Sequence, residues 1–132
     1  MAEITEFVAP WLSVALDISP GSRVLDVGGG NGRLCAILAR AHPDCRFGVL
    51  DIHAEGDFER VTYVQGDFLK WVPAGFDHLL LKNVLHDWGD ETAQVILERC
   101  ASAVVPGARL SVMELILPED GSGGGGAARA VL

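Results

Sequence analysis

Apolar residues follow two alternating patterns along the chain: short continuous runs and stretches with helical spacing. Over 31–41 and 91–104 the spacing places apolar side chains on one face of a helix. The continuous runs predict buried strands at 24–27, 46–50, 61–65, 76–81 and 109–116. Strands that alternate with helices predict an α/β fold with a mostly parallel sheet, right-handed crossovers and helices on both faces.

Turn residues and low-complexity sequence divide the chain into three parts. We expect an N-terminal helix within residues 1–19, which begins or kinks near Pro10, and one folded core over 20–118. Residues 119–132 include a run of glycine and serine that is typical of a flexible tail. The last residues, 127–132, are expected to begin a helix that the chain does not complete.

Residues typical of helix ends and loops predict the start and end of the helix at 91–104 and the nature of the stretch 52–60. Asp90 is expected to cap the helix at 91–104, and Pro106-Gly107 to end it. The stretch 52–60 is polar and short, so we expect a loop or one turn rather than a full helix.

A glycine-rich turn lies between the first strand and the first helix of this core. The chain passes from Val27 into Gly28-Gly29-Gly30-Asn31-Gly32, and glycine adopts a positive φ at no steric cost. Such a turn also lets the backbone approach a ligand, and the next helix offers free N–H groups at its start. The pattern predicts a nucleotide-binding unit, and a tight turn without a ligand is the alternative.

Polar and aromatic side chains follow the other strands. The carboxyl ends of parallel strands meet at one edge of the sheet, where ligands bind in such folds. The residues expected at this edge, beside Gly28 and Gly30, are Asp51, Asp67, Phe68, Lys82, His86 and Glu114.

The first four of these suit a nucleotide. Asp51 is placed for hydrogen bonds to ribose hydroxyls, and Asp67 for an adenine amino group, with Phe68 packed on the ring. The structural alternatives are a solvated strand-end carboxylate, a turn carboxylate and a core aromatic. Lys82 either meets a ligand carboxylate or extends its ammonium group into solvent from the strand end.

His86 is the candidate general base, because its ordinary pKa suits proton transfer near neutral pH. It lies in a loop just past the fourth strand, whereas His42, His53 and His78 are expected to be structural. Glu114 or Asp87 could orient the imidazole and favour its charged form.

Composition limits the class of protein and its partners. The chain has 132 residues, 49% of them hydrophobic, which is enough for one well-cored domain. A net charge of −8 argues against nucleic acid as a partner. No apolar run has membrane-spanning length, and the first residues lack a basic region followed by an apolar core, so we expect no signal peptide. Three cysteines without a CxxC pair suggest reduced thiols and a cytoplasmic location.

Several ligand classes are excluded by spacing. The third glycine of the NAD fingerprint is missing in both registers, and there is no P-loop motif. No cluster of histidine, cysteine or carboxylate residues has metal-ligand spacing, so we expect no metal site.

The remaining motifs resemble those of one family. The run Val24 to Gly32 resembles motif I of S-adenosylmethionine (SAM)-dependent methyltransferases, which implies a Rossmann-like class I methyltransferase fold. Gly66-Asp67-Phe68, the segment 81–91 with its His-Asp-Trp string, and the segment 113–118 resemble the caffeic acid type of small-molecule O-methyltransferase. The resemblance covers about residues 16 to 120.

The resemblance also implies roles for residues. Gly28, Asp51, Asp67, Phe68 and Lys82 would contact SAM, with Gly30 in the same turn. His86 would deprotonate the acceptor hydroxyl with support from Glu114, and methyl transfer to a small, aromatic hydroxylated acceptor would leave S-adenosylhomocysteine.

Members of the family are longer than this chain. They carry an N-terminal helical domain, and beyond the fifth strand a helix and a final antiparallel strand pair, both of which are expected to be missing here. The alternative is therefore a non-catalytic cofactor-binding remnant or a partner-dependent subunit. A homodimer or a partner chain would use the sheet edge exposed beyond the fifth strand.

Overall fold

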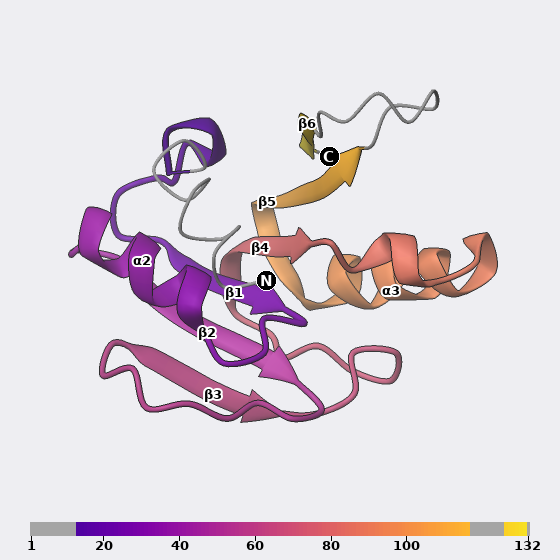
Figure 1. Cartoon of the computed structure of the whole chain (residues 1–132), viewed down its shortest axis with the longest axis horizontal. Helices are drawn as coiled ribbons and strands as arrows, with labels where there is room; N and C mark the ends of the chain where they lie inside the picture. Colours follow the sequence, from indigo (N-terminus) through magenta and orange to yellow (C-terminus); the bar gives the residue numbers. More distant parts are fainter. Residues whose placement is uncertain (1–12, 117–125, 132) are drawn as a thin grey trace.

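A computed structural model describes residues 13–116 and 126–131, with side chains described to residue 114. Five parallel strands form most of one sheet: β1 Arg23–Val27, β2 Arg46–Asp51, β3 Val61–Gln65, β4 Phe76–Lys82 and β5 Val104–Ile116. A sixth strand, β6 Gly126–Val131, pairs antiparallel with β5, and the strand order is β3-β2-β1-β4-β5-β6 (Figure 1). The predicted α/β class and mostly parallel sheet are confirmed.

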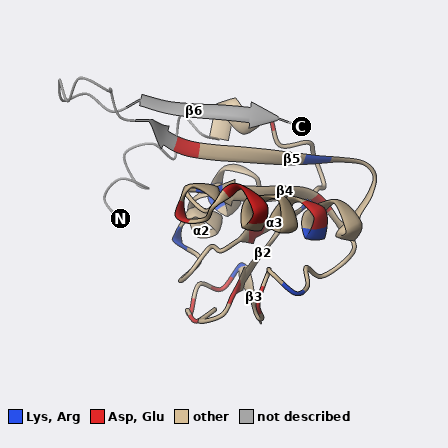
Figure 2. Cartoon of the chain, turned by 90° about the vertical axis from the view of Figure 1, so that its right-hand side faces the viewer, with Lys and Arg blue, Asp and Glu red and all other residues tan. Residues whose placement is uncertain are grey.

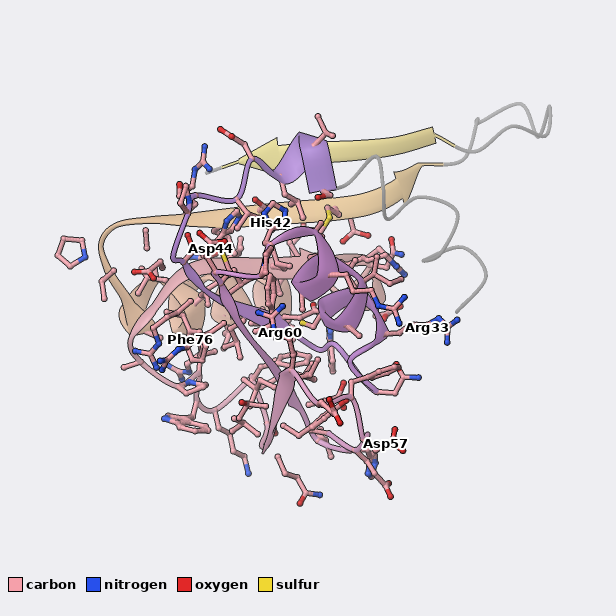
Figure 3. The ribbon with its side chains drawn as sticks, turned by 90° about the vertical axis from the view of Figure 1, so that its left-hand side faces the viewer. Arg33, His42, Asp44, Asp57, Arg60 and Phe76 are labelled. Atoms are coloured by element: carbon pink, nitrogen blue, oxygen red, sulfur yellow. The ribbon has the colours of Figure 1, made fainter. Side chains whose placement is uncertain are left out.

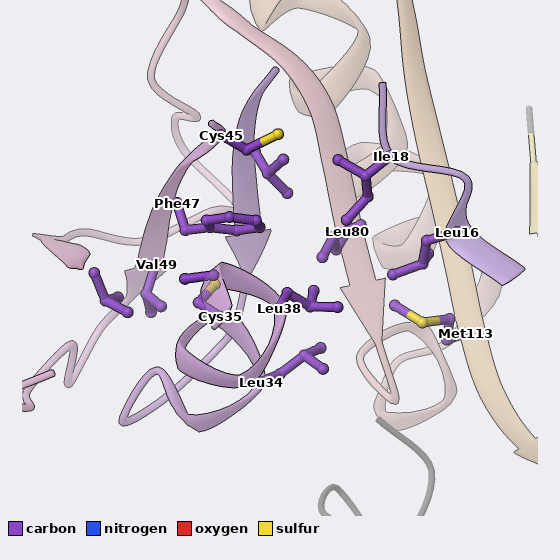
Figure 4. Packing of buried hydrophobic residues seen from close by; sticks show 13 residues of the cluster. Leu16, Ile18, Leu34, Cys35, Leu38, Cys45, Phe47, Val49, Leu80 and Met113 are labelled. Carbon is purple, nitrogen blue, oxygen red and sulfur yellow. The ribbon is translucent and has the colours of Figure 1, made fainter. Parts of the chain in front are cut away.

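Two helices cover opposite faces of the sheet. Along β1, Val24 belongs to the cluster that packs against α2 (Arg33–Ala41), and Leu25 to the cluster that packs against α3 (Asp90–Ala103). This alternation follows from the two-residue period of a strand. Figure 4 shows the α2 side, where Leu34 and Leu38 lie over the strand residues Phe47, Val49 and Leu80.

An arginine fastens the end of α2. The guanidinium group of Arg60 donates to the carbonyl oxygens of Ala39, Pro43 and Cys45. Figure 3 labels Arg60 below His42, the residue that follows α2. The last carbonyls of a helix lack partners within the helix, and a cation there also meets the negative end of the helix dipole. The segment before β3 is thereby held against the end of α2.

The expectations for helix ends are confirmed only in part. Residues 13–16 are helical, while the rest of the predicted N-terminal helix lies outside the described residues. The residue before α3 is Gly89, and no side chain caps that helix, so the prediction of Asp90 as the cap is wrong. Asp90 is the first helical residue, where its charge complements the helix dipole.

Strand β5 begins earlier than predicted and contains a bulge. Val104, directly after α3, pairs with Phe76, and Arg109 pairs with His78, so the pairing shifts between these points. Pro106 and Gly107 lie in that bulge, with φ of 83° at Gly107. The expectation that they end a helix is wrong, because the backbone bulges within the strand instead.

The region after β5 also differs from expectation. The predicted start of a helix at 127–132 is wrong, because 126–131 pair with β5 as β6. Part of the predicted tail is therefore sheet, and residues 119–125 and 132 lie outside the description. The outer side of β5, expected to be exposed, is paired with β6, so the strands at the sheet edges are β3 and β6. Among described residues, no helix is long and apolar enough to cross a bilayer.

The strand order reverses between β1 and β4. The chain moves outward from β1 through β2 to β3, then returns to place β4 on the other side of β1. A crevice forms outside the carboxyl ends at such a switch point, which is the usual ligand position in open α/β sheets. The glycine turn follows β1 there, and the short 3-10 helix η1 (Leu85–Asp87) follows β4.

Candidate functional site

The glycine turn after β1 depends on left-handed backbone angles. Gly28, Gly30 and Gly32 have φ of 80°, 60° and 83°, a region that other L-residues rarely occupy. The Gly28 amide donates to the Leu50 carbonyl over 2.7 Å, and the Gly32 amide to the Gly29 carbonyl over 3.1 Å. The turn is therefore fixed to β2 and leads directly into α2.

Asp51 joins the end of β2 to this turn. Its two carboxylate oxygens each accept a backbone N–H at 3.0 Å, one from Gly30 and one from His53. These bonds fix the carboxylate beside the turn, and each oxygen keeps a further lone pair for a hydroxyl donor. Gly30 and Asp51, predicted separately from spacing, are thus in direct contact.

Phe68 lies against the glycine turn. A Cβ added to Gly28 would come within 3.4 Å of the Phe68 ring and 3.0 Å of a Val84 methyl group. Phe68 also packs edge-on against Trp88, with ring centroids 6.3 Å apart. The segment after β3 and the segment after β4 therefore meet over Gly28.

Asp67 uses its side chain locally. Its carboxylate accepts the Leu69 amide at 2.9 Å, and its carbonyl accepts the amides of Lys70 and Trp71. The neighbouring Gly66 amide donates to the Asp51 carbonyl over 3.0 Å, which brings this turn beside the end of β2. Asp67 is thus placed at the predicted edge, with one carboxylate oxygen engaged by its own turn.

A buried carboxyl group that sequence reasoning did not select lies below the turn. Asp26 on β1 is 3% exposed, and a Cβ added to Gly29 would come within 2.7 Å of its carboxyl carbon. Burial raises the pKa of Asp26 to about 7; the positive charge of Lys82 opposes this shift, and the negative charge of Asp51 adds to it. Lys82 at the end of β4 is half-buried and belongs electrostatically to the same site.

Tyr63 on β3 is a second residue that the sequence analysis missed. Its hydroxyl donates to the Asn31 carbonyl over 2.7 Å, inside the glycine turn. Added Cβ atoms at Gly32 and Gly56 would come within 2.7 Å and 2.3 Å of the same hydroxyl oxygen, so both glycines leave room for the phenol. Gly32, Gly56 and Tyr63 are far apart in the sequence and form no local motif, so the sequence alone does not predict this contact.

Exposed apolar surface borders the same edge. Ile52, directly after Asp51, is 49% exposed. A large side chain left in water beside a polar cluster is suited to one face of a flat, apolar ligand group. The sequence signal that could have identified Ile52 is its position directly after Asp51, the acidic residue at the end of β2.

The His86–Glu114 pair is formed as predicted. Nδ1 of His86 lies 2.5 Å from Oε2 of Glu114, and Oε1 of Glu114 accepts the Leu85 amide at 3.1 Å. The hydrogen bond with Glu114 raises the pKa of His86, opposed by partial desolvation and aided by the charges of Glu114 and Asp87. Figure 2 shows acidic colour on β5 near its carboxyl end.

The site consists of two adjoining parts. The first contains the glycine turn, Asp51 and Lys82, and the second contains His86 and Glu114. The Phe68–Trp88 contact and Val84 connect them. In the part of the chain that the structure describes, no three histidine, cysteine or carboxylate groups are placed to hold a metal ion.

Comparisons with known proteins agree with this geometry. A family profile described as an O-methyltransferase domain matches residues 1–129. Mitomycin biosynthesis 6-O-methyltransferase of Streptomyces lavendulae is 32% identical over an alignment of 130 residues that covers 90% of this chain and 37% of that protein. The resemblance inferred from the motifs is confirmed.

Two solved structures share the fold. Human N-acetylserotonin methyltransferase in complex with SAM has a TM-score of 0.79 at 30% identity, over 93% of this chain and 38% of that one. NcsB1, an O-methyltransferase from neocarzinostatin biosynthesis, in complex with SAM and 2-hydroxy-5-methyl naphthoic acid, has a TM-score of 0.71 at 32% identity, over 84% and 38%. The chain therefore spans less than two fifths of the length of these relatives.

Proposed function

Because the chain belongs to the O-methyltransferase domain family, whose cofactor is SAM, we propose that it binds SAM beside the glycine turn and methylates a hydroxyl of a small aromatic acceptor. His86 is the general base in this proposal. The observation that carries it is the 2.5 Å contact between His86 and Glu114, next to a glycine turn hydrogen-bonded to Asp51.

The described residues fit the parts of SAM. Backbone angles at Gly28 and Gly30 open the turn for close approach, and the Asp51 carboxylate is fixed for ribose hydroxyls. Phe68 and exposed Ile52 offer apolar surface to adenine, with Asp67 nearby for its amino group. Lys82, half-buried at the end of β4, provides a positive charge for the carboxylate of the amino-acid part.

The contact with Glu114 fixes the orientation of the His86 imidazole through Nδ1. Glu114 accepts a hydrogen bond from Nδ1–H, which leaves Nε2 as the atom that takes the acceptor proton. Glu114 then stabilises the imidazolium ion that forms. The cofactor supplies an electrophilic methyl group on a sulfonium, and the protein aligns the hydroxyl oxygen and removes its proton.

Calorimetry with SAM tests the cofactor site. We expect binding by the unmodified chain and a large loss of affinity in Asp51→Ala. Turnover with a panel of hydroxylated aromatic compounds tests the reaction, and His86→Gln should abolish it while SAM still binds. Retained SAM binding in Asp51→Ala would reject the assigned site, and full turnover in His86→Gln would reject the base.

A second candidate function follows from length. The chain spans 37% of the mitomycin enzyme and 38% of the solved relatives, so most of the length of each relative falls outside the match. The alternative is a cofactor-binding subunit that needs a partner chain or a second copy, joined at an edge strand of the sheet. Light scattering tests this alternative: a stable monomer that turns over acceptor alone would reject it.

A further inference from the structure

Both ring nitrogens of His86 face carboxylates. Nδ1 lies 2.5 Å from Glu114, and Nε2 lies 3.1 Å from Oδ1 of Asp87. Glu114 comes from β5, whereas Asp87 belongs to the same short helix as His86. The imidazole is therefore held from two sides by two different elements.

This arrangement favours one protonation state of His86. A neutral histidine with its proton on Nδ1 would direct the Nε2 lone pair at the Asp87 carboxylate, which also has only lone pairs to offer. An imidazolium ion donates to Glu114 from Nδ1, and its positive charge attracts the Asp87 carboxylate beside Nε2. Close contact with two carboxylates therefore favours the charged form of His86, in which Nε2 holds a proton and cannot act as a base.

We propose that Asp87 is a positioning residue that holds the base nitrogen of His86 in the resting site and must be displaced by the acceptor hydroxyl. The proposal rests on the proposed function, since it assigns Nε2 as the base atom. Nε2 first loses its proton to solvent as Asp87 moves away, and the acceptor hydroxyl then donates to the free lone pair.

The proton balance of the reaction gives Asp87 a second use. The new O–CH3 bond forms as the S–CH3 bond breaks, the sulfonium becomes a neutral thioether, and the hydroxyl proton moves to Nε2. Asp87 can then form its ion pair with the charged imidazole again. Its side chain is 64% exposed, so the proton has a direct route to water.

Other charges near His86 do not replace this contact. The element α3 packs against η1, and its first turn carries Asp90 and Glu91. Neither forms an ion pair with His86 among the described side chains. Lys82 precedes η1 at the end of β4. Asp87 and Glu114 are thus the two carboxylates that act on the imidazole at close range.

A titration of His86 by NMR tests the proposal without any need for turnover. The ring signals of the four histidines are followed with pH, and His86 is assigned by its loss in His86→Gln. Asp87→Asn should lower the pKa of His86. At pH 6, the neutral fraction should rise roughly twofold to fivefold, the range for an exposed ion pair.

Two further variants provide a larger expected shift of the His86 pKa and a control without a shift. Glu114→Gln should lower the pKa of His86 more than Asp87→Asn, because its hydrogen bond makes the largest contribution. Asp90→Asn removes the same charge nearby without an ion pair to His86 and should leave the titration unchanged. In an active preparation, Asp87→Asn should also move the acidic limb of the kcat/KM profile to lower pH.

The outcomes separate this proposal from the proposed function. An unchanged His86 titration in Asp87→Asn, or an equal shift in Asp90→Asn, would overturn the positioning role even if SAM binds and acceptor is methylated. A lowered pKa in Asp87→Asn alone would support it even if SAM binding fails, which would count only against the proposed function.

Discussion

The backbone amide of Gly30 donates to the carboxylate of Asp51 over 3.0 Å, so the turn after β1 and the end of β2 form one hydrogen-bonded unit. A ligand that contacts the turn is thereby placed next to a fixed anion. The same carboxylate accepts the His53 amide, which holds the start of the following loop.

Asp51→Asn should weaken SAM binding roughly tenfold to a hundredfold, the range for loss of charged hydrogen bonds. The amide side chain has one acceptor oxygen in place of two, so the N–H groups of Gly30 and His53 can no longer each donate to a separate oxygen. Calorimetry measures the change. Asp57→Asn, an exposed loop residue, is the matched control, and equal affinities in the two variants would contradict the assignment of Asp51.

Gly28→Ala should destabilise the fold and weaken SAM binding together. The alanine must adopt φ of 80°, and its methyl group would lie 3.0 Å from Val84 and 3.4 Å from Phe68. We expect a loss of about 1–3 kcal/mol in the free energy of unfolding. Urea denaturation measures it.

Gly107→Ala provides the comparison, since Gly107 has φ of 83° and nothing within 4 Å of an added Cβ. Gly107 lies in the β5 bulge. The Gly107→Ala variant has the same unfavourable positive φ as Gly28→Ala, but its added methyl group meets no neighbouring atom. It should lose less stability and keep its SAM affinity. If both variants bind SAM equally well, Gly28 does not contact the cofactor.

Tyr63→Phe should release the glycine turn at Asn31. Loss of one hydrogen bond should cost about 1 kcal/mol of stability and should reduce SAM affinity, because the turn loses an anchor. Ser22→Ala removes a 2.6 Å hydroxyl bond to Ser19 before β1, at the other end of the sheet. That variant should lose similar stability with no change in affinity. Unchanged SAM binding in Tyr63→Phe would assign the hydroxyl to stability alone.

Asp26 should make folding stability depend on pH. Its pKa is about 7 in the folded chain against 3.8 ordinarily, so the folded state retains a proton that the unfolded chain loses. Stability should therefore fall as pH rises from about 4 to 7 and level off above, by at most about 4 kcal/mol.

The Asp26→Asn variant isolates this contribution. Its free energy of unfolding, followed by urea denaturation from pH 4 to pH 8, should lack the decline that Asp26 causes in the unmodified chain. Asp57→Asn should keep that decline. A variant that tracks the unmodified chain at every pH would show that Asp26 is already ionised when folded.

The sheet and much of the site could be predicted because both follow from short-range patterns. Apolar runs identified the parallel strands, and the rule that strand ends share an edge brought His86 and Glu114 together across 28 positions. Tyr63 and Asp26 could not be found in this way. Their roles depend on which side chains meet the glycine turn in space, and neither contact has a local motif.

The two wrong predictions around β5 have one cause. Pro106 and Gly107 normally terminate helices, and the glycine and alanine residues of 126–131 have little strand propensity. In the structure, pairing with a neighbouring strand outweighs local preference at both places. Val104 pairs with β4 before the bulge, and β6 pairs along β5.

The β5 bulge sets the length of chain between α3 and Glu114. Side chains on a strand alternate between faces, so removing one residue from 105–108 would either open the pairing with β4 or turn Glu114 to the opposite face. His86 would then lose its partner through an edit at the far end of the strand. The bulge in this chain is therefore a spacer that keeps Glu114 in contact with His86, and shortening it would affect more than a surface turn.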